Sequence, residues 1–468
     1  MDLGPDTETN VTLHIYDTMQ RQKVQFVPRT EGQVAMYVCG PTVYDVPHLG
    51  HGRTSLTYDV IRRYLEWTGW NVTVASNVTD IDDKIIKRAE AEGRTEPEVA
   101  AEFSRAYDEQ MQRLDILPAQ SRPHATEFIE GMIDIISELV AKDAAYVVPD
   151  KGVYFSVQGL SDYGRLAGRD LDQLLEDAGQ RVDVDAEKRS PIDFALWKSA
   201  KSGEPSWDTP WGSGRPGWHT ECVAMSLSAL GPGFDIHGGG DDLCFPHHQN
   251  EWAQVTAIGK PFARYWVHSA MVNVGGEKMS KSLGNFTTIN KLLLDFDGES
   301  IRYALLQGHY RAPLSFSGKT LTEAKKSLSR LYRSVDGFEI NGDPDQEIME
   351  YLYQDLNTPK ALARAHYLAE QANKGSKECG QQLKNSSKVL GILSLSTNIW
   401  FKYGKDIEDN NQNLDVNISD EEINKLILKR KKAKDNRDFH EADLIREKLL
   451  ELNIILEDKP DITTWRKS

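Results

Sequence analysis

Residues 34–75 contain the pattern that most restricts what this chain can fold into. The apolar run Val34–Cys39 stops at a Gly-Pro pair and is typical of a buried strand. Apolar residues then recur at helical spacing over roughly 50–68, and Asn71–Ala75 has the composition of a second strand. This strand–helix–strand unit predicts a parallel sheet with right-handed crossovers. Ligands bind beyond the carboxyl ends of such strands, so we expect a functional site just after Cys39.

Beyond this unit the sequence predicts an insertion, a return to the sheet and a helical end. A helix near Phe128–Leu139 precedes a hairpin of Tyr146–Val148 and Val153–Ser156, and the sheet resumes around Phe234–Ile236. The remaining expected elements are helices over roughly 321–335, 346–374 and 380–395, an Asn- and Asp-rich linker over 403–418, a capping box at Ser419 and Glu422, a basic helix, and a strand at Ile454–Leu456.

Bulk properties exclude several classes of protein. No apolar run reaches the ~18 residues of a membrane helix, and the acidic start lacks the features of a secretory signal. We therefore expect a cytoplasmic protein with no membrane partner. Four cysteines in 468 residues do not make a disulfide framework.

The formal net charge of −16 disfavours nonspecific binding of nucleic acid, but it leaves room for a local basic patch. Such a patch comprises Lys425, Lys429, Arg430, Lys431, Lys432, Lys434 and Arg437. A solvated helix face is the alternative interpretation of the same residues.

Two short motifs indicate phosphate chemistry. His48 and His51 share a face at a helix start, where imidazoles can donate hydrogen bonds to nucleotide phosphates while Gly50 lets the base approach closely. Lys278 and Lys281 lie in a Gly- and Ser-rich loop and can stabilise charge that develops on a transferring phosphate. Taken alone, the first motif is also compatible with two surface histidines and the second with a flexible basic loop.

The segment His237–Gly240 resembles the oxyanion loop of esterases, but the chain has no G-x-S-x-G elbow to accompany it. It also has no G-x-x-x-x-G-K-[ST] loop, which argues against a P-loop NTPase. A glycine-rich strand end followed by Asp242 instead suits adenosine, because a carboxylate accepts hydrogen bonds from ribose hydroxyls.

A possible metal set combines two cysteines, a histidine and a glutamate. His247 and Glu251 are four residues apart, so both point to one side of a helix. With Cys222 and Cys39 they offer two thiolates, one imidazole and one carboxylate, which is a reasonable zinc set. Two neighbours are alternatives. Cys244 lies three residues before His247 and can share its face of the helix. His248, the next residue, points about 100° away from His247 around the helix and is expected to pack or bind substrate.

Longer strings give the sequence a specific resemblance. They are Gly40–Asp45, Asn77–Lys84, Arg215–Cys222, Phe245–Glu251, Leu456–Asp458 and Thr464–Arg466. Together with Pro47–His51 and Lys278–Ser282, they resemble the cysteinyl-tRNA synthetases among the class I aminoacyl-tRNA synthetases, along nearly the whole chain. The resemblance implies a cysteine–tRNA ligase that forms cysteinyl-adenylate from ATP and transfers the cysteinyl group to the terminal ribose of tRNA(Cys).

The resemblance also implies roles for particular residues. The zinc ligands fall on Cys39, Cys222, His247 and Glu251, with one ion per chain and Cys244 left out. Thr79 holds the substrate cysteine and Trp218 closes its pocket, although core packing is the alternative for Trp218. The catalytic residues are His48, His51, Lys278 and Lys281. The expected contacts of Mg-ATP are Pro41, His48, Gly50, His51, His237, Gly238, Gly240, Asp242, Lys278, Ser280, Lys281 and Ser282.

We expect a monomer with a Rossmann-like catalytic domain, an inserted connective domain, a helical bundle and a small C-terminal α/β module. The expected domains are 1–120 and 201–265 (the catalytic halves), 121–200 (connective insertion), 266–320 (stem-contact region), 321–402 (helical bundle), 403–418 (linker) and 419–468 (anticodon module). Anticodon contacts are expected from Lys434, Arg437, Phe439, Asp443 and Asp458, with amphipathic packing as the alternative.

Two other functions are alternatives for this sequence. One is a ligase that activates cysteine in the same way but joins it to an amino-sugar inositol in mycothiol synthesis, and it lacks the extended anticodon-binding end. The other is a non-catalytic tRNA-binding relative, against which the intact histidine and lysine motifs argue.

Overall fold

The computed structural model describes residues 13–179, 188–274, 277–278, 287–403, 420–436, 438–452, 454–458 and 463–467. These residues divide into two compact units. The first extends to Asn290 and also takes in Leu305–Phe316 and Met349–Ala361, and the second comprises the rest. The domain boundaries expected from the sequence stay predictions.

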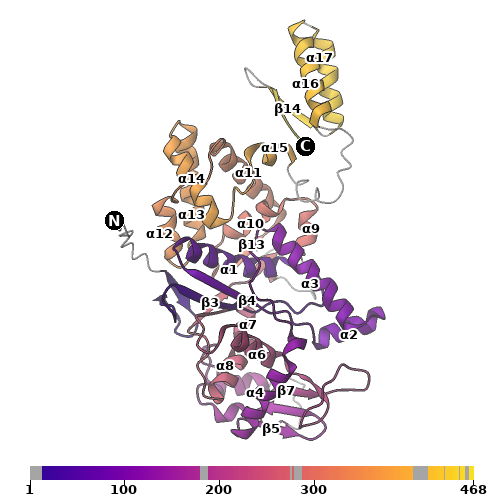
Figure 1. Cartoon of the computed structure of the whole chain (residues 1–468), viewed down its shortest axis with the longest axis vertical. Coiled ribbons are helices and arrows are strands. Elements are labelled where there is room, and N and C mark those ends of the chain that lie inside the picture. Colours follow the sequence, from indigo (N-terminus) through magenta and orange to yellow (C-terminus); the bar gives the residue numbers. More distant parts are fainter. Residues whose placement is uncertain are drawn as a thin grey trace, which may run out of the picture. The chain divides into compact units, whose positions relative to one another are not determined.

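A four-stranded parallel sheet forms the centre of the first unit. Its strands are β3 (Gln33–Val38), β4 (Asn71–Ser76), β9 (Ile236–Gly240) and β10 (Tyr265–Ser269), in the spatial order β10-β9-β3-β4. Helix α1 (Leu49–Trp67) connects β3 to β4, which confirms the predicted strand–helix–strand unit (Figure 1). Because all four strands are parallel, their carboxyl ends lie at one edge, immediately before Cys39, Asn77, Asp241 and Ala270.

The inserted segment builds a second, antiparallel sheet. Its strands β5 (Ala145–Val148), β6 (Gly152–Phe155), β7 (Phe194–Ser199) and β8 (Gly214–Pro216) pair in chain order. The predicted hairpin is therefore confirmed as β5 and β6. Helix α6 (Trp218–Leu230) packs against both α4 (Ile129–Ala141) and α8 (Gln249–Ala257) in the same unit.

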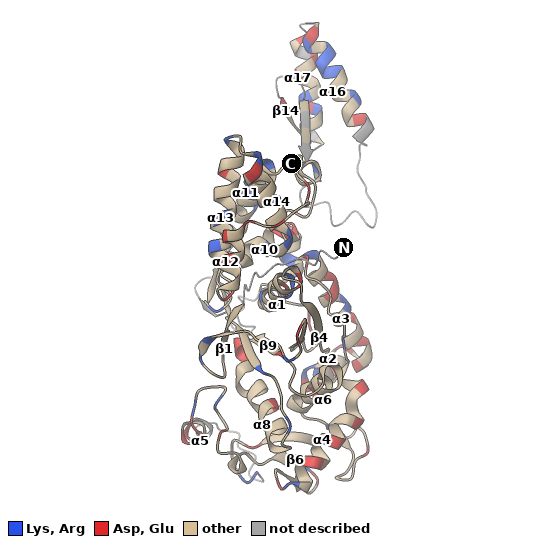
Figure 2. Ribbon diagram, turned by 60° about the vertical axis from the view of Figure 1, so that its left-hand side comes forward, with Lys and Arg blue, Asp and Glu red and all other residues tan. Residues whose placement is uncertain are grey.

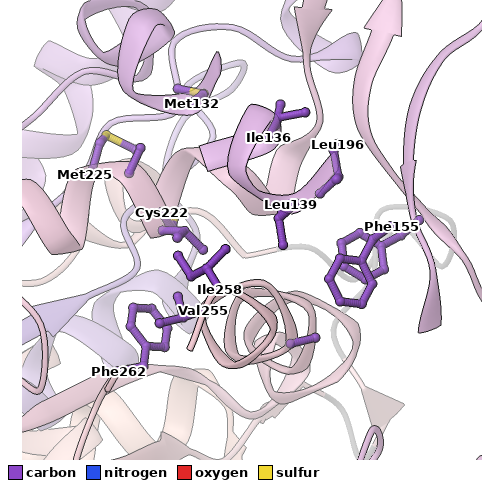
Figure 3. Close-up of a cluster of buried hydrophobic side chains, with 14 of the residues drawn as sticks. Met132, Ile136, Leu139, Phe155, Leu196, Cys222, Met225, Val255, Ile258 and Phe262 are labelled. Atoms are coloured by element: carbon purple, nitrogen blue, oxygen red, sulfur yellow. The ribbon is translucent and has the colours of Figure 1, made fainter. Parts of the chain in front are cut away.

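One hydrophobic core joins these elements. Figure 3 shows Met132, Ile136 and Leu139 of α4 close to Cys222 and Met225 of α6. Phe155 and Leu196 of the antiparallel sheet belong to the same cluster. Cys222 is 1 % exposed, so one predicted metal ligand comes from a helix that the core holds firmly.

The other elements of the first unit are short or peripheral. They are β1 (His14–Asp17), β2 (Gln22–Gln25), α2 (Asp83–Glu92), α3 (Glu96–Arg113), η1 (Ala125–Phe128), η2 (Val157–Gly159), α5 (Leu171–Gly179), α7 (Asp241–Leu243), η3 (Cys244–His248), β11 (Val272–Val274), β12 (Glu277–Lys278) and β13 (Leu314–Phe316). Among the described helices, α9 (Ile289–Leu293), α10 (Gly298–Leu306), α12 (Gln346–Tyr353) and α13 (Thr358–Asn373) lie partly in each unit.

The helical region differs from its prediction at one point. The expected helix over 346–374 is two helices, α12 and α13 (Thr358–Asn373). Asp355 and Leu356, between them, have φ angles of 64° and 52°, which no α-helix contains. Asp355 accepts hydrogen bonds from Tyr16 N and Tyr310 Oη and pairs with Arg311, so tertiary contacts explain the break.

The second unit contains a helical bundle and a C-terminal module. The bundle helices are α10 (Gly298–Leu306), α11 (Gly318–Ser334), α14 (Lys377–Leu390) and α15 (Thr397–Tyr403), together with α13. The module pairs α16 (Asp420–Asp435) and α17 (Phe439–Glu451) with the hairpin β14 (Ile454–Asp458) and β15 (Thr463–Lys467). Strand β15 was not predicted, although its Trp465 is 5 % exposed in the module core.

Basic side chains gather along α16 (Figure 2). Among the described residues, no helix has both the length and the apolar character that crossing a membrane requires. Of the predicted linker over 403–418, Tyr403 belongs to a helix (Thr397–Tyr403), and residues 404–418 lie outside the described residues. Ser419 of the predicted capping box also lies outside them.

Candidate active site and metal centre

A cavity of about 330 Å³ opens at the carboxyl edge of the parallel sheet. Six of the residues predicted to bind ATP line it: Pro41, His48, Gly50, His51, Gly240 and Asp242. Cys39 and Trp218 line it as well, so the phosphate motif and the predicted metal set meet at one cavity. His237 and Gly238 are buried within β9. A Cβ atom on Gly238 would lie 2.2 Å from the Tyr58 ring, so packing alone requires this glycine.

The two histidines of the first motif cap helix α1. His48 is the N-cap residue, and its Nδ1 accepts the backbone N–H of His51 at 3.3 Å. The Nδ1 of His51 accepts the backbone N–H of His48 at 3.2 Å, and the two rings stack 3.7 Å apart. An Nδ1 that accepts leaves the proton of a neutral imidazole on Nε2. Both rings thus present an N–H donor at a helix N-terminus, which suits an anionic ligand.

The predicted metal ligands converge from three separate segments of the chain. One donor atom from each of Cys39, Cys222, His247 and Glu251 lies within 4.8 Å of all the others, and all four residues are buried. The two Sγ atoms are 3.7 Å apart, and His247 Nε2 is 3.0 Å from Glu251 Oε1. The i, i+4 relation of His247 and Glu251 therefore brings their donor atoms to one side, as the sequence predicts.

A second set of donors overlaps the first. Cys39, His237, His248 and Glu251 also converge within 4.8 Å. His237 Nε2 lies 2.7 Å from Glu251 Oε2, so the two oxygens of Glu251 face different histidines. His248 Nδ1 is hydrogen-bonded to His268 Nε2 at 2.8 Å. Sequence motifs alone left His248 open as an alternative ligand, and its place in this second set leaves it open.

Burial controls the protonation of these groups. It raises the pKa of the Cys39 thiol well above its usual value and that of Cys222 to about 12. Burial also raises the pKa of Glu251 and lowers the pKa of His247 well below the usual range. In the absence of a cation, burial therefore favours the neutral forms of these donors. A divalent cation has the charge that reverses this preference for the thiols and the carboxyl.

The residues predicted to hold the amino acid lie close to the metal cluster. The Trp218 ring stacks on His247 with 4.3 Å between centroids, and 37 % of the residue is exposed. This exposure excludes the alternative of core packing for Trp218. Thr79 is 1 % exposed and donates a hydrogen bond to Glu221. The thiol of Cys244 donates to Leu166 O at 3.6 Å, and Cys244 is a member of neither donor set.

The loop that carries Lys278 and Lys281 lies largely outside the part of the chain that the structure describes. Ser280, Lys281 and Ser282 are not described, and for Lys278 only the backbone, in β12, is described. Their predicted roles stay predictions.

The predicted anticodon residues fall in two places on the C-terminal module. Asp458 accepts hydrogen bonds from both terminal nitrogens of Arg430, at 2.7 and 2.8 Å, and from Lys434 at 3.0 Å. Phe439, 63 % exposed, begins α17, and Asp443 is exposed one turn later. Arg437 lies outside the described residues.

Sequence reasoning missed two polar contacts near these sites. Arg430 is 3 % exposed, so the interpretation of the basic patch as a solvated face is wrong for this residue. Its place on α16 gave no signal, because its partner Asp458 comes from a strand 28 residues away in the chain. Glu221 directly precedes the predicted ligand Cys222, yet nothing in its spacing indicates a buried carboxyl beside Thr79.

Comparison with known proteins agrees with this geometry. Residues 25–326 match the family model of class I (C) tRNA synthetase catalytic domains, and residues 419–466 match that of the cysteinyl-tRNA ligase anticodon binding domain. A cysteine–tRNA ligase of Methylobacillus flagellatus is 45 % identical over 465 residues, covering 97 % of this chain and 100 % of the relative. The corresponding protein of Acinetobacter baumannii is 44 % identical over 470 residues, covering 97 % and 99 %.

Solved structures agree on the fold. The structure of Mycobacterium tuberculosis methionyl-tRNA synthetase with methionyl-adenylate has a TM-score of 0.54 at 14 % identity, covering 76 % of this chain and 88 % of that one. A leucyl-tRNA synthetase complex of Agrobacterium radiobacter has a TM-score of 0.55 at 11 % identity, covering 78 % and 83 %. The catalytic fold, the two family models and the near full-length relatives all indicate the same family. This chain therefore belongs to the cysteine–tRNA ligase family of class I aminoacyl-tRNA synthetases.

Proposed function

We propose that this chain activates L-cysteine with Mg-ATP and transfers it to tRNA(Cys). In the first step a carboxylate oxygen of cysteine attacks the α-phosphorus, the bond to the bridging oxygen breaks, and pyrophosphate leaves. In the second step the terminal ribose hydroxyl of the tRNA attacks the activated carbonyl and AMP leaves. The protein supplies no covalent nucleophile. Positioning and stabilisation of charge account for the rate.

The observation that carries this proposal is the meeting of a metal-competent cluster with a nucleotide-sized cavity. Cys39 belongs to both. Within the cavity His48 and His51 offer Nε2–H donors for the phosphates, and Asp242 offers acceptors for the ribose. Lys278 and Lys281 are proposed to stabilise the charge that develops on the transferring phosphate.

The donor set fits zinc. Two thiols, an imidazole and a carboxylate match the sulfur, nitrogen and oxygen ligands that zinc prefers, and their mutual distances suit one ion. Cys39, Cys222, His247 and Glu251 would hold it. When bound, zinc supplies a Lewis acid that lowers the pKa of a substrate thiol and favours sulfur over the oxygen of serine. Shape alone distinguishes such near-isosteres by only about 1–3 kcal/mol.

Transfer to tRNA rests on the C-terminal module. We infer that Lys434, Arg437, Phe439, Asp443 and Asp458 contact the anticodon, with Phe439 available for stacking because its ring is exposed. Within the described residues Asp458 has two basic partners, so besides its own contact it is expected to hold Lys434 and Arg430 in place.

Two assays on the full chain test the function. Cysteine-dependent exchange between ATP and pyrophosphate reports activation, and charging of tRNA(Cys) with radiolabelled cysteine reports transfer. The proposal expects both. Exchange without charging would favour the mycothiol-type ligase, and the absence of both would favour the non-catalytic relative.

A further inference from the structure

The catalytic cavity contains a cation that the proposed mechanism does not use. Lys84, at the start of α2, lines the cavity together with His48 and His51. It is exposed, so it stands where the cavity opens to solvent. Its ammonium group lies 5.1 Å from the centroid of the Tyr44 ring, and Tyr44 lines the cavity as well. An aromatic face thus holds this charge at the opening.

The carboxylates that precede Lys84 in the chain are engaged elsewhere. Asp82 is the N-cap of α2 and accepts the backbone N–H of Lys84 at 2.8 Å. Asp83 pairs with Lys198 at 2.8 Å and with Arg215. In the part of the chain that the structure describes, no ion pair joins the ammonium group of Lys84 to a carboxylate. The charge of Lys84 is therefore available to an anion from outside the protein.

The order of the strands places Lys84 away from the ribose end of the cavity. The parallel sheet has the order β10-β9-β3-β4, and Asp242 follows β9 whereas Lys84 follows β4. Helix α1, whose start carries His48 and His51, follows β3. Along the carboxyl edge of the sheet, the two histidines therefore lie between Asp242 and Lys84.

The anionic groups of the three reactants occupy different places in this cavity. In the proposed function the phosphates of ATP extend from the ribose at Asp242 to the imidazoles of His48 and His51. The carboxylate of cysteine loses its charge when the adenylate forms, so it is no partner for a cation in the second step. The tRNA enters from solvent, and its last phosphodiester lies at the opening when the terminal ribose reaches the adenylate. This phosphodiester is the anion whose place matches that of Lys84.

We propose that Lys84 binds the last phosphodiester of the tRNA and thereby positions the terminal ribose for the transfer of cysteine. This inference rests on the proposed function and assigns Lys84 to its second step alone. An ammonium group on a phosphate makes a charge-assisted contact that fixes position and carries no base specificity. Lys84 acts on the rate of transfer, and adenylate formation depends on the other residues of the cavity.

The test separates the two steps in the full chain loaded with zinc. In single-turnover assays at limiting tRNA, transfer from the bound adenylate to tRNA(Cys) is expected to be at least about tenfold slower in Lys84→Ala, while pyrophosphate exchange changes by less than about threefold. The slope of the logarithm of tRNA affinity against the logarithm of salt concentration should also fall by about 0.7, the value for one phosphate on a single strand. Equal losses in exchange and transfer, or no loss in transfer, would overturn the proposal.

A modified tRNA locates the contact without any change to the protein. When the last phosphodiester of tRNA(Cys) is replaced by an uncharged methylphosphonate, transfer by the wild-type chain should slow by about the same factor as in Lys84→Ala. The modified tRNA should not slow Lys84→Ala further, since the variant and the modified tRNA lack the same contact. Losses that add would contradict the proposal.

Two variants of the same helix are the controls. Lys84→Arg keeps the positive charge and should retain the wild-type rate of transfer to within about threefold. Lys87→Ala removes an exposed lysine of α2 that does not line the cavity, and it should transfer cysteine as the wild type does. A loss in Lys87→Ala as large as that in Lys84→Ala would indicate a general attraction of RNA to α2 and would contradict a specific contact in the cavity.

The wild-type chain separates this inference from the proposed function. If it shows neither pyrophosphate exchange nor charging of tRNA, the proposed function fails. If both are normal and Lys84→Ala transfers cysteine at the wild-type rate, only the role of Lys84 is wrong.

Discussion

Cys222 distinguishes the two overlapping donor sets because it belongs to only one of them. In the set Cys39, Cys222, His247 and Glu251 it provides one of two sulfur atoms. Replacement by serine substitutes a poor zinc ligand at a position that the core holds fixed. We predict that Cys222→Ser lowers the zinc content of purified protein by more than about tenfold, measured by elemental analysis. Cys244→Ser is the matched control and should keep its zinc.

The opposite outcome has a structural meaning. If Cys222→Ser keeps its metal and His248→Asn loses it, the ion occupies the second set instead. His248 and His237 would then be ligands, and the assignment of Cys222 and His247 would be wrong.

At the scale of elements, Glu299 joins three parts of the helical bundle. From α10 it accepts hydrogen bonds from Tyr332 Oη of α11 at 2.7 Å and from the backbone N–H of Leu393, after α14, at 2.6 Å. Burial raises the pKa of Glu299 to about 7. Since the folded state then binds a proton that the unfolded state has released, this group makes stability fall as the pH rises from about 4.3 to about 7.

A variant that lacks the ionisable carboxyl of Glu299 should reveal this dependence of stability on pH. Glu299→Gln is expected to gain stability relative to the wild type, by up to about 3 kcal/mol, as the pH rises through that window. Thermal unfolding of the full chain at several pH values measures it. The exposed pair of Glu370 and Lys374 supplies a control, Glu370→Gln, whose melting temperature should follow the wild type at every pH. If the melting temperature of Glu299→Gln changed with pH in parallel with that of the wild type, the raised pKa of Glu299 would be refuted.

In the C-terminal module, Asp458 fastens the β14–β15 hairpin to α16. Its pKa is depressed far below the usual value, chiefly by the hydrogen bonds from Arg430. A depressed pKa adds stability above the unfolded value of about 3.9, and this stability is lost as the pH falls below it. Asp458→Asn should therefore destabilise the module, by only about 1 kcal/mol at neutral pH because solvent screens a carboxylate that is 37 % exposed. Faster hydrogen exchange in β14 and α16 of Asp458→Asn would reveal this destabilisation. The substitution Lys429→Ala, at an exposed side chain of α16, is the control and should leave the exchange of β14 unchanged.

Local patterns predicted the elements that neighbouring residues determine. An apolar run and strand composition predicted β3 and β4, and helical spacing predicted α1. The break at Asp355 was not predictable, because its cause is a set of hydrogen bonds to residues distant in sequence. Strand β15 was missed for the same reason, since its pairing with β14 decides its conformation. The donor set was identified through resemblance, whereas spacing alone left Cys244 and His248 open.

At the scale of the whole molecule, the cavity and the C-terminal module lie in different compact units. We predict that deletion of 403–468 lowers the rate of tRNA charging by at least about a hundredfold but changes pyrophosphate exchange by less than about threefold, since contacts to the anticodon contribute to tRNA binding and not to adenylate formation. Parallel assays on the truncated chain measure both rates. Equal losses would contradict the separation of the two functions.

The central claim is that a zinc ion in the buried cluster selects the thiol of cysteine. The most direct measurement is pyrophosphate exchange with cysteine and with serine, performed on the full chain as purified, after removal of metal by a chelator, and after zinc is restored. We predict one zinc per chain, loss of cysteine-dependent exchange on chelation, recovery with zinc, and no response to serine at equal concentration. Full cysteine-dependent exchange by a chain free of metal would contradict it.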